Sequence, residues 1–258
     1  MAAEKPGRSD PARTLALLWR AKEPPARGPK PGLSVDRIVA AAIGLADDSG
    51  VGSLSMRRVA ERLGVGTMSL YTYVPGKDEL LNLMLDAVLA EVEERRPVGF
   101  IGTWREALEQ HARADRAVAL RHPWVVSLST PGLMLMGPAE TARSEFAMKA
   151  VSEIGLTQRE MVDVVNLVDG YVRGVAQITA DIGTANRESD VDYEDWWEKA
   201  TPMLERFIQQ SRYPTLYAVW NSGAFETPPE EGFEFGLQRL LDGVEQLVEA
   251  RAAASPGD

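Results

Sequence analysis

Two short helical patterns separated by one glycine constrain this chain more than any other feature of its sequence. The segment Ser55–Lys77 has the sequence SMRRVAERLGVGTMSLYTYVPGK. Gly64 stands where the backbone must reverse, because a left-handed conformation there carries a steric penalty for other residues. Ala60 is small where a second helix would cross the first, so the segment predicts a helix-turn-helix. The branched apolar residues spaced to lock its two helices together are Val59, Leu63, Val65 and Leu70.

The second predicted helix would carry short polar and aromatic side chains on its outer face. They are Thr67, Met68, Ser69, Tyr71, Thr72 and Tyr73. Groups of this kind suit a groove lined with phosphates and base edges. Arg57, Arg58 and Arg62 on the first helix would add positive charge where that helix crosses a nucleic-acid backbone. This face therefore predicts binding to double-stranded DNA.

The distribution of charge along the chain agrees with a DNA-binding N-terminal region. The whole chain has a net charge of −10, which by itself argues against a nucleic-acid partner. Residues 1–76, however, contain eleven Lys and Arg against seven Asp and Glu, whereas the remainder contains 17 basic and 31 acidic residues. A basic head on an acidic body predicts that only the head meets a polyanion.

Residues Leu33–Leu89 resemble the DNA-binding region of the tetracycline-repressor (TetR) family. The resemblance rests on three stretches: IVAAAIGLADDSG, LSMRRVAERLGV, and SLYTYV followed by KDEL. It implies an all-α dimer whose larger C-terminal domain binds a small effector. It also implies base contacts from Arg57, Thr67 and Met68. The residues it implies for phosphate contacts are Ser69, Tyr71, Tyr73 and Lys77.

The sequence leaves alternatives open at this segment. A helical hairpin that does not bind DNA would share several of its features. Tyr71 could pack its ring beside core Leu70 while exposing its hydroxyl. Met68 could be a spacer instead of a base contact, and Lys77 could pair with the acidic residues that follow it.

The fold class is predicted as all-α, because every convincing pattern beyond Phe100 is helical and no stretch alternates long enough for a strand. We expect a flexible arm over residues 1–32, with one or two helical turns from Thr14 to Arg20. A helix-turn-helix domain over 33–76, a connecting helix over 77–96, and an effector-binding and dimerisation domain over 97–258 would follow. The helices expected in the last domain are Thr103–Arg121, Ala139–Ile154, Thr157–Asp181, Tyr193–Ser211 and Phe233–Ala252, with loops that include Gly183 and Pro214.

Capping residues set the expected ends of two helices. Ser34 can accept a backbone N–H at the start of the first helix of the head, and Gly50 offers a stop for that helix. Thr157 and Glu160 have the spacing of a capping box, in which two side chains satisfy each other's free backbone donors. Both patterns predict where the chain enters a helix.

Aromatic and methionine residues indicate where an effector pocket would lie. Its expected apolar lining is Trp104, Leu108, His111, Trp124, Met134, Met136, Phe146 and Tyr171. Asn166 and Asp169 would be its sparse polar anchors. The alternative is that these side chains form plain core, which is the more common role of an apolar stripe on a helix.

The sequence predicts neither an enzyme nor a metal or cofactor site. Without cysteine, thiolate ligands and cysteine nucleophiles are excluded. No Walker A loop, G-x-S-x-G elbow or H-E-x-x-H motif occurs. His122 lacks a recognisable set of partner ligands, so we expect a surface or loop histidine. No signal peptide or membrane-length apolar run is present either, so the expected location is the cytoplasm.

One short recognition helix contacts too few bases for a specific operator, so two heads must be joined. Apolar stripes on Thr157–Asp181 and Phe233–Ala252 suit an isologous four-helix joint. Its seam would contain Val168, Val172, Val175, Leu237, Leu240, Leu241 and Val244. The expected function is a homodimeric repressor of a palindromic operator, released by a small-molecule effector. The alternatives are an effector-independent DNA-binding protein and a helical small-molecule-binding protein without operator binding.

Overall fold

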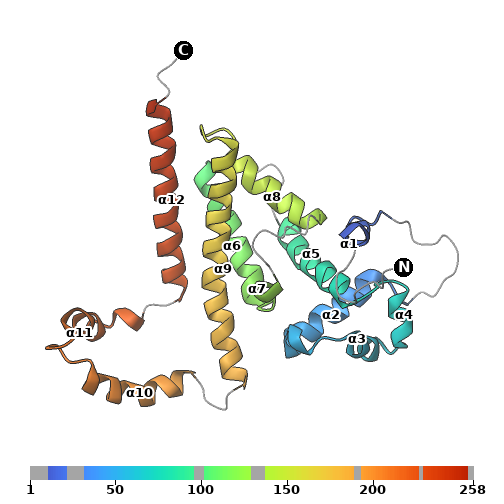
Figure 1. Cartoon of the computed structure of the whole chain (residues 1–258), viewed down its shortest axis with the longest axis horizontal. Coiled ribbons are helices and arrows are strands. Elements are labelled where there is room, and N and C mark those ends of the chain that lie inside the picture. The colour runs from blue at the N-terminus through green and yellow to red at the C-terminus, as the bar shows by residue number, and fades with distance from the viewer. Residues whose placement is uncertain are drawn as a thin grey trace, which may run out of the picture. The chain divides into compact units, whose positions relative to one another are not determined.

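The computed structural model describes residues 11–21, 32–95, 102–128, 137–188, 193–226 and 229–254. All regular elements within these ranges are helices (Figure 1), which confirms the predicted fold class. The chain divides into two compact units, Met1–Arg173 and Gly174–Asp258. The division falls within one long helix, α9 (Gln158–Glu188).

Three helices form the predicted helix-turn-helix region of the first unit. They are α2 (Val35–Ser49), α3 (Met56–Leu63) and α4 (Thr67–Tyr71), with a 3₁₀ turn, η1 (Val51–Ser53), between the first two. Gly64 follows α3 with φ 67° and ψ 32°, the left-handed conformation that the sequence predicts. Val59 and Leu70 are completely buried and Ala60 nearly so. The small residue and the branched residues therefore fix α4 against α3, as their spacing indicates.

The predicted caps are present. The Ser34 hydroxyl accepts a hydrogen bond from the Arg37 N–H, 3.2 Å away, and Gly50 ends the same helix. At the start of α9, the Thr157 N–H donates to Glu160 Oε2 at 2.9 Å, and the Glu160 N–H donates to Thr157 Oγ1 at 3.3 Å. These bonds satisfy backbone donors that a helix N-terminus leaves free.

Helix α5 (Lys77–Arg95) is the element against which the head packs. It contacts α2, and it also contacts α1 (Pro11–Leu18), which lies beside it in Figure 1. Thr14 and Leu18 of α1 are buried. Helix α1 begins at a proline, three residues before the predicted start at Thr14. Proline suits the first position of a helix because its ring fixes φ at a helical value. Residues 11–18 are thus part of the packed head, and the rest of the predicted arm, residues 1–10 and 22–31, lies outside the described residues.

The remainder of the first unit is a small helical body. Its helices are α6 (Trp104–Arg121), α7 (Val125–Leu128), α8 (Pro138–Ala150) and the first part of α9. Helix α8 packs against both α5 and α6, and α5 also contacts α6 directly. The short α7 was not predicted, because four residues carry too little periodicity to indicate a helix.

A carboxylate on α5 caps the N-terminus of α8. Asp86 Oδ1 accepts hydrogen bonds from the backbone N–H groups of Ala139, at 3.0 Å, and Glu140, at 3.4 Å. Gly137 is required beside it, because a Cβ at that position would overlap the Asp86 carboxylate. Burial raises the pKa of Asp86, and the two backbone hydrogen bonds oppose that shift. This cap joins the helix that carries the head to the body.

The second unit contains the end of α9 and three further α-helices. They are α10 (Tyr193–Phe207), α11 (Pro214–Asn221) and α12 (Pro229–Ala254), with a 3₁₀ turn, η2 (Ala224–Glu226), before the last. Two loop predictions are wrong. Pro214 lies in the first turn of α11, where proline is tolerated because its missing N–H would have no helical partner. Gly183 lies inside α9, which runs seven residues past the predicted Asp181.

Candidate functional site

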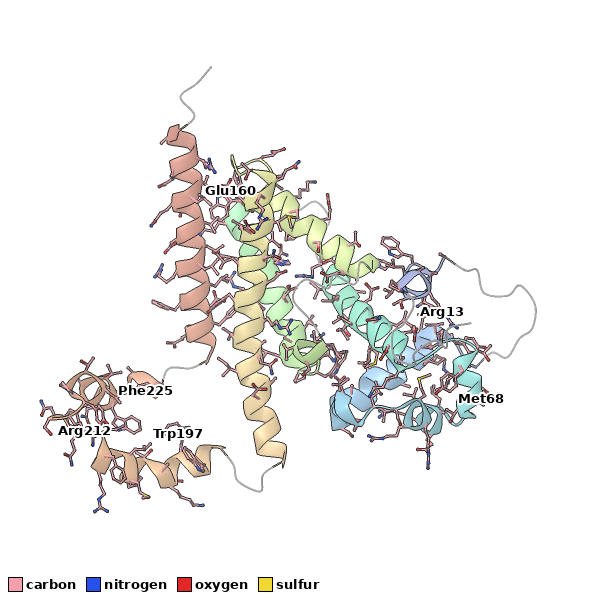
Figure 2. The ribbon with its side chains drawn as sticks, in the orientation of Figure 1. Arg13, Met68, Glu160, Trp197, Arg212 and Phe225 are labelled. Atoms are coloured by element: carbon pink, nitrogen blue, oxygen red, sulfur yellow. The ribbon has the colours of Figure 1, made fainter. Side chains whose placement is uncertain are left out.

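Helix α4 presents the side chains that the sequence predicts for a DNA-binding face. Met68 is 78% exposed and points away from the rest of the head (Figure 2). Tyr71, Tyr73 and Ser69 are also exposed, and Thr67 is half-buried. Because Leu70 between them is completely buried, one side of α4 holds the core and the other is open to a partner. Tyr71 is 41% exposed, so part of this side chain is open to a partner.

The arginines of α3 are engaged within the protein. Arg57 Nε donates to Glu61 Oε1 at 2.8 Å, one helical turn away. Arg62 donates to the carboxylate of Asp48 on α2 at 2.7 Å. Arg58 donates to the backbone carbonyl of residue 53 at 3.0 Å. Their charge is thus partly compensated before any DNA approaches.

The positive charge of the N-terminal region is not in the helix-turn-helix itself. Residues 33–76 contain four basic and four acidic residues, whereas residues 1–32 contain seven basic and three acidic ones. The expected basic head is therefore a neutral recognition unit preceded by a basic arm. Lys77, at the start of α5, is exposed, and among the described residues it pairs with no carboxylate. It remains a cation open to a phosphate.

The residues predicted for an effector pocket differ in burial within the described part of the chain. Leu108, His111 and Trp124 are buried. Trp104, Phe146, Asp169 and Tyr171 are half-buried, and Asn166 is exposed. Met134 and Met136 lie outside the described residues. Trp124 belongs to the same apolar cluster as the core of the head, so for this residue the core alternative holds.

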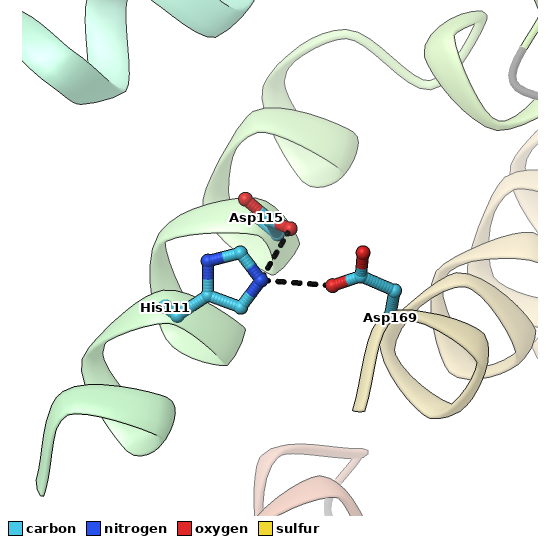
Figure 3. A group of neighbouring side chains, drawn as sticks. All are labelled: His111, Asp115 and Asp169. Atoms are coloured by element: carbon cyan, nitrogen blue, oxygen red, sulfur yellow. Dashed lines mark hydrogen bonds and ion pairs between the residues drawn. The ribbon is translucent and has the colours of Figure 1, made fainter. Parts of the chain in front are cut away.

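Asp169 belongs to a buried ion network between α6, α8 and α9. His111 Nε2 lies 2.8 Å from one Asp169 oxygen, and Figure 3 shows that the same ring nitrogen also faces an oxygen of Asp115. The Arg143 guanidinium donates to Asp115 at 2.5 Å, to Asp169 at 3.1 Å and to Glu140 at 3.1 Å. Burial opposes ionisation of Asp169, but the hydrogen bond from His111 and the charge of Arg143 outweigh it and lower its pKa to about 2. Each member of this network makes at least one hydrogen bond or ion pair across these helices, although His111 Nδ1 and Asp115 Oδ1 are buried without a hydrogen-bond partner. We therefore assign the network a structural role.

Three of these side chains have the composition of a metal site. One nitrogen of His111 and one oxygen each of Asp115 and Asp169 lie within 4.8 Å of one another. The Arg143 guanidinium bonds both carboxylates, so positive charge is already supplied between them. We therefore assign no metal to this group. The sequence analysis missed Asp115 and Arg143; the only local signal was the i, i+4 spacing that puts His111 and Asp115 on one face of α6.

A cavity of about 140 Å³ lies between α5 and α6. Its lining residues are Glu91, Val92, Gln110, Ala114, Ala117, Val118 and Arg121. None of them was predicted as an effector contact. Gln110 Oε1 is buried without a hydrogen-bond partner, so the polar part of this region is not fully satisfied. The cavity is smaller than the roughly 300–1,000 Å³ of typical small-molecule sites.

The side chains predicted for a dimer seam are mostly buried in the single chain. Val168, Val172, Leu237, Leu241 and Val244 are 0–4% exposed, and Val175 and Leu240 are half-buried. The exposed apolar side chains on the same two helices are Val162, Leu167, Ile178 and Phe235.

Within the described ranges, no helix is long and apolar enough to cross a membrane.

Comparison with known proteins agrees with this geometry. Residues 38–84 match the family described as bacterial regulatory proteins, tetR family, and residues 99–248 match the tetracyclin repressor-like C-terminal domain. The HTH-type transcriptional repressor DrrR1 of Streptomyces coeruleorubidus is 44% identical over 254 residues, 98% of this chain and 92% of that protein. An HTH-type transcriptional regulator of Saccharopolyspora erythraea is 34% identical over 83% of this chain and 86% of its own.

Solved structures give the same result. Apo ActR from Streptomyces coelicolor is similar with a TM-score of 0.71 and 26% identity, covering 88% of this chain and 100% of that one. ActR in complex with actinorhodin is similar with a TM-score of 0.69 and 27% identity, covering 83% of this chain and 96% of that one. Both domains of the resemblance seen in the sequence are thereby confirmed. This chain belongs to the TetR family of bacterial transcriptional regulators.

Proposed function

We propose that this protein is a repressor that binds a palindromic operator as a homodimer and releases it when a small molecule enters the body between α5 and α6. The observation that carries the proposal is the exposed face of α4, held in place by the completely buried Leu70 and by the turn at Gly64. Because its target would be chromosomal DNA, the protein would act in the cytoplasm. A regulator of this kind needs no catalytic residue and no cofactor.

The contacts with DNA would be of two kinds. Arg57, Thr67 and Met68 would touch bases, and Ser69, Tyr71, Tyr73 and Lys77 would hold phosphates. Phosphate contacts position a protein without reading sequence, so Lys77→Ala should weaken binding to every fragment and flatten the salt dependence by about one unit of slope. Met68→Ala should instead change which fragment is preferred.

The experiment is selection of bound fragments from a genomic DNA pool, followed by gel shifts with the wild type and these two variants. An unchanged salt slope for Lys77→Ala, together with an unchanged fragment preference for Met68→Ala, would contradict the assignment of α4 as the DNA-recognition helix. Failure of the wild type to bind any fragment would favour the small-molecule-binding alternative.

The α5–α6 cavity supports effector control over effector-independent binding. Since about 140 Å³ is smaller than most small-molecule sites, a ligand of ordinary size would enter by parting α5 from α6. Helix α5 also packs against α2 of the head, so parting the helices would move the head relative to the body. A relative of known structure, ActR, has been crystallised with actinorhodin, and we propose a small-molecule effector for this chain by analogy. The ligand would act by favouring the parted state, to the extent that it binds that state more tightly.

Members of this family dimerise, and a second copy is the partner we propose for the exposed apolar side chains of α9 and α12. Phe235 on α12 is 66% exposed, so a charge there would leave the single chain intact but disrupt a seam that covers it. Phe235→Glu should sediment as a monomer and lose tight operator binding. Phe225→Glu, at an equally exposed phenylalanine of η2, is the matched control and should remain dimeric. A wild-type protein that is monomeric at micromolar concentration and still binds its operator tightly would contradict the dimer.

A further inference from the structure

One carboxylate of the head is bound by two side chains from the loop between α6 and α7. Asp47 Oδ1, near the end of α2, accepts a hydrogen bond from His122 Nδ1 at 2.8 Å and another from Trp124 Nε1 at 2.7 Å. Both donors are buried, and their rings lie 5.8 Å apart. His122 lies in the loop that follows α6, as predicted, but it is buried and not at the surface. It caps the end of α6 and faces the head. Because its partner Asp47 is 75 residues away in the chain, no local sequence pattern predicts this contact.

The same histidine also faces α5. Its second nitrogen, Nε2, is buried without a hydrogen-bond partner and lies 3.6 Å from Glu91 Oε1. The other oxygen of Glu91 accepts from Arg121 at 2.6 Å. Two sets of contacts thus connect α2 of the head, α5 and the end of α6. One set consists of Asp47, His122 and Trp124, and the other is the ion pair of Glu91 and Arg121. We call this set of five residues the joint.

The joint shares a wall with the cavity. Glu91 and Arg121 belong to both, and Val118 of the cavity lies in the apolar cluster that contains Trp124 and the core of the head. Because this pair joins α5 to α6, a molecule that separates the two helices would displace it. His122 is the next residue along the chain from Arg121 and would move with it. The hydrogen bonds to Asp47 are directional and partly buried, so a shift of α6 by a fraction of their length would break them.

We propose that Asp47, His122 and Trp124 are positioning residues that hold the head in its DNA-binding orientation, and that filling the α5–α6 cavity is transmitted to the head by breaking their hydrogen bonds. This inference rests on the proposed function, because it names the contact through which that function is regulated. Two distinct arrangements, bonded and broken, provide the two-state element that coupling between sites requires.

The test needs no identified effector, because a side chain can occupy the cavity. Ala114 lines it, and Ala114→Phe places a ring in its space. Operator affinity would be measured for the wild type and Ala114→Phe, and then again for both in an Asp47→Ala background, with the DNA fragment selected as above. Asp47→Asn keeps an oxygen that can accept both hydrogen bonds, and it serves as the conservative variant. Asp48→Ala removes the neighbouring exposed carboxylate, which pairs with Arg62 and not with the joint, and it is the matched control.

We expect Ala114→Phe to weaken operator binding about tenfold or more in the wild-type, Asp47→Asn and Asp48→Ala backgrounds, within the range of typical coupling between sites. In the Asp47→Ala background, where the joint is already broken, the same substitution should weaken binding less than twofold. Thermal unfolding would verify that each variant is folded at the temperature used. If Asp47→Ala does not fold, Trp124→Phe provides an alternative break, because it removes the indole N–H, together with part of the ring, and leaves the hydrogen bond between Asp47 and His122 in place.

An equal loss from Ala114→Phe in all backgrounds would overturn the inference, because the cavity would then act on DNA binding by a route outside the joint. No loss in the wild type would overturn it as well. Either result would leave operator binding, and hence the proposed function, in place. Failure of the wild-type protein to bind any genomic fragment would instead remove the proposed function itself.

Discussion

The helix-turn-helix and the ion network of the body are both firmly built, but from residues at very different distances along the chain. In the head, the hydroxyl of Ser34 caps the N–H three residues later, and Gly64 turns the chain without any distant partner. In the body, His111 binds a carboxylate 58 residues away, and Arg143 joins residues 28 positions before it and 26 after it. Local features leave a pattern in the sequence, whereas a long-range ion network does not. The helix-turn-helix was therefore predictable, and the ion network of the body was not.

Removing the central cation of the network should have the largest effect on stability. Arg143→Leu leaves Asp115, Glu140 and Asp169 close together with no guanidinium to compensate them. Breaking a buried ion pair by removing one partner typically costs about 3–5 kcal/mol. We expect the free energy of unfolding, measured by urea denaturation at neutral pH, to fall by that amount.

The control for this prediction is an arginine of similar local geometry in an exposed pair. Arg159 pairs with Asp163 at 2.9 Å on the surface of α9, and such pairs contribute about 0–1 kcal/mol. Arg159→Leu should therefore leave the urea midpoint almost unchanged. If both arginine variants lose the same stability, the network has no special role in holding α8 to α6 and α9.

The corresponding experiment in the head is Leu70→Ala. Leu70 is completely buried, and truncating such a side chain typically costs about 2–5 kcal/mol. Because it fixes α4 in place, we expect gel shifts to show loss of operator binding as well as lower stability. Met68→Ala, two residues away and largely exposed, should change the free energy of unfolding by less than about 0.5 kcal/mol. Retention of full operator affinity by Leu70→Ala would separate DNA binding from the packing of α4.

Much of the fold followed from local chemistry. The ends of α2 and the start of α9 agree with the prediction because Ser34, Gly50 and Thr157 act on backbone groups within a few residues. The turn at Pro214 was misassigned because proline stops a helix from its interior but is favoured in its first turn, and a single sequence does not say which applies.

The functional-site predictions show the same difference between local and long-range features. The exposed face of α4 was predictable because the spacing of buried residues around Leu70 determines which side chains remain outside. The contacts of His122 and Asp169 were not predicted, because they depend on Asp47 and Arg143, which no local pattern connects to them. The α5–α6 cavity was missed for a related reason: Ala114 and Ala117 are small residues, and space between helices leaves no sequence motif.

Acid should loosen the body through Asp169. Its pKa in the folded protein is lowered from 3.8 to about 2, a shift that corresponds to about 2 kcal/mol. A depressed folded-state pKa contributes stability above the unfolded value and loses it as pH falls toward the folded value. The free energy of unfolding should therefore fall between pH 4 and pH 2. Asp169→Asn should lower stability at neutral pH and flatten the slope in that window, and an unchanged slope would show that other carboxylates cause it.

The smallest expected effect comes from changing the net charge of the helix-turn-helix, which is zero in the wild type. Glu61 holds Arg57 in an exposed pair at 2.8 Å, and the carboxylate lies on the helix that would cross the DNA backbone. Glu61→Gln frees the guanidinium and removes a negative charge that repels phosphates. We expect operator affinity to rise a few-fold at low salt and the free energy of unfolding to stay almost unchanged, since exposed pairs contribute little.

Asp163→Asn is a close control for this change. Its pair with Arg159 has the same i, i+4 spacing and nearly the same exposure, 85% and 54% for the two side chains against 82% and 58% for Arg57 and Glu61. Both variants alter the net charge of the protein equally, so a general effect of charge would raise DNA affinity in both. Only Glu61→Gln should do so if the effect arises at the α3 surface, and its advantage should shrink as salt is raised and screening increases. Equal affinities for the two variants at every salt concentration would mean that α3 does not approach the phosphates and that the positive charge for binding comes from the arm alone.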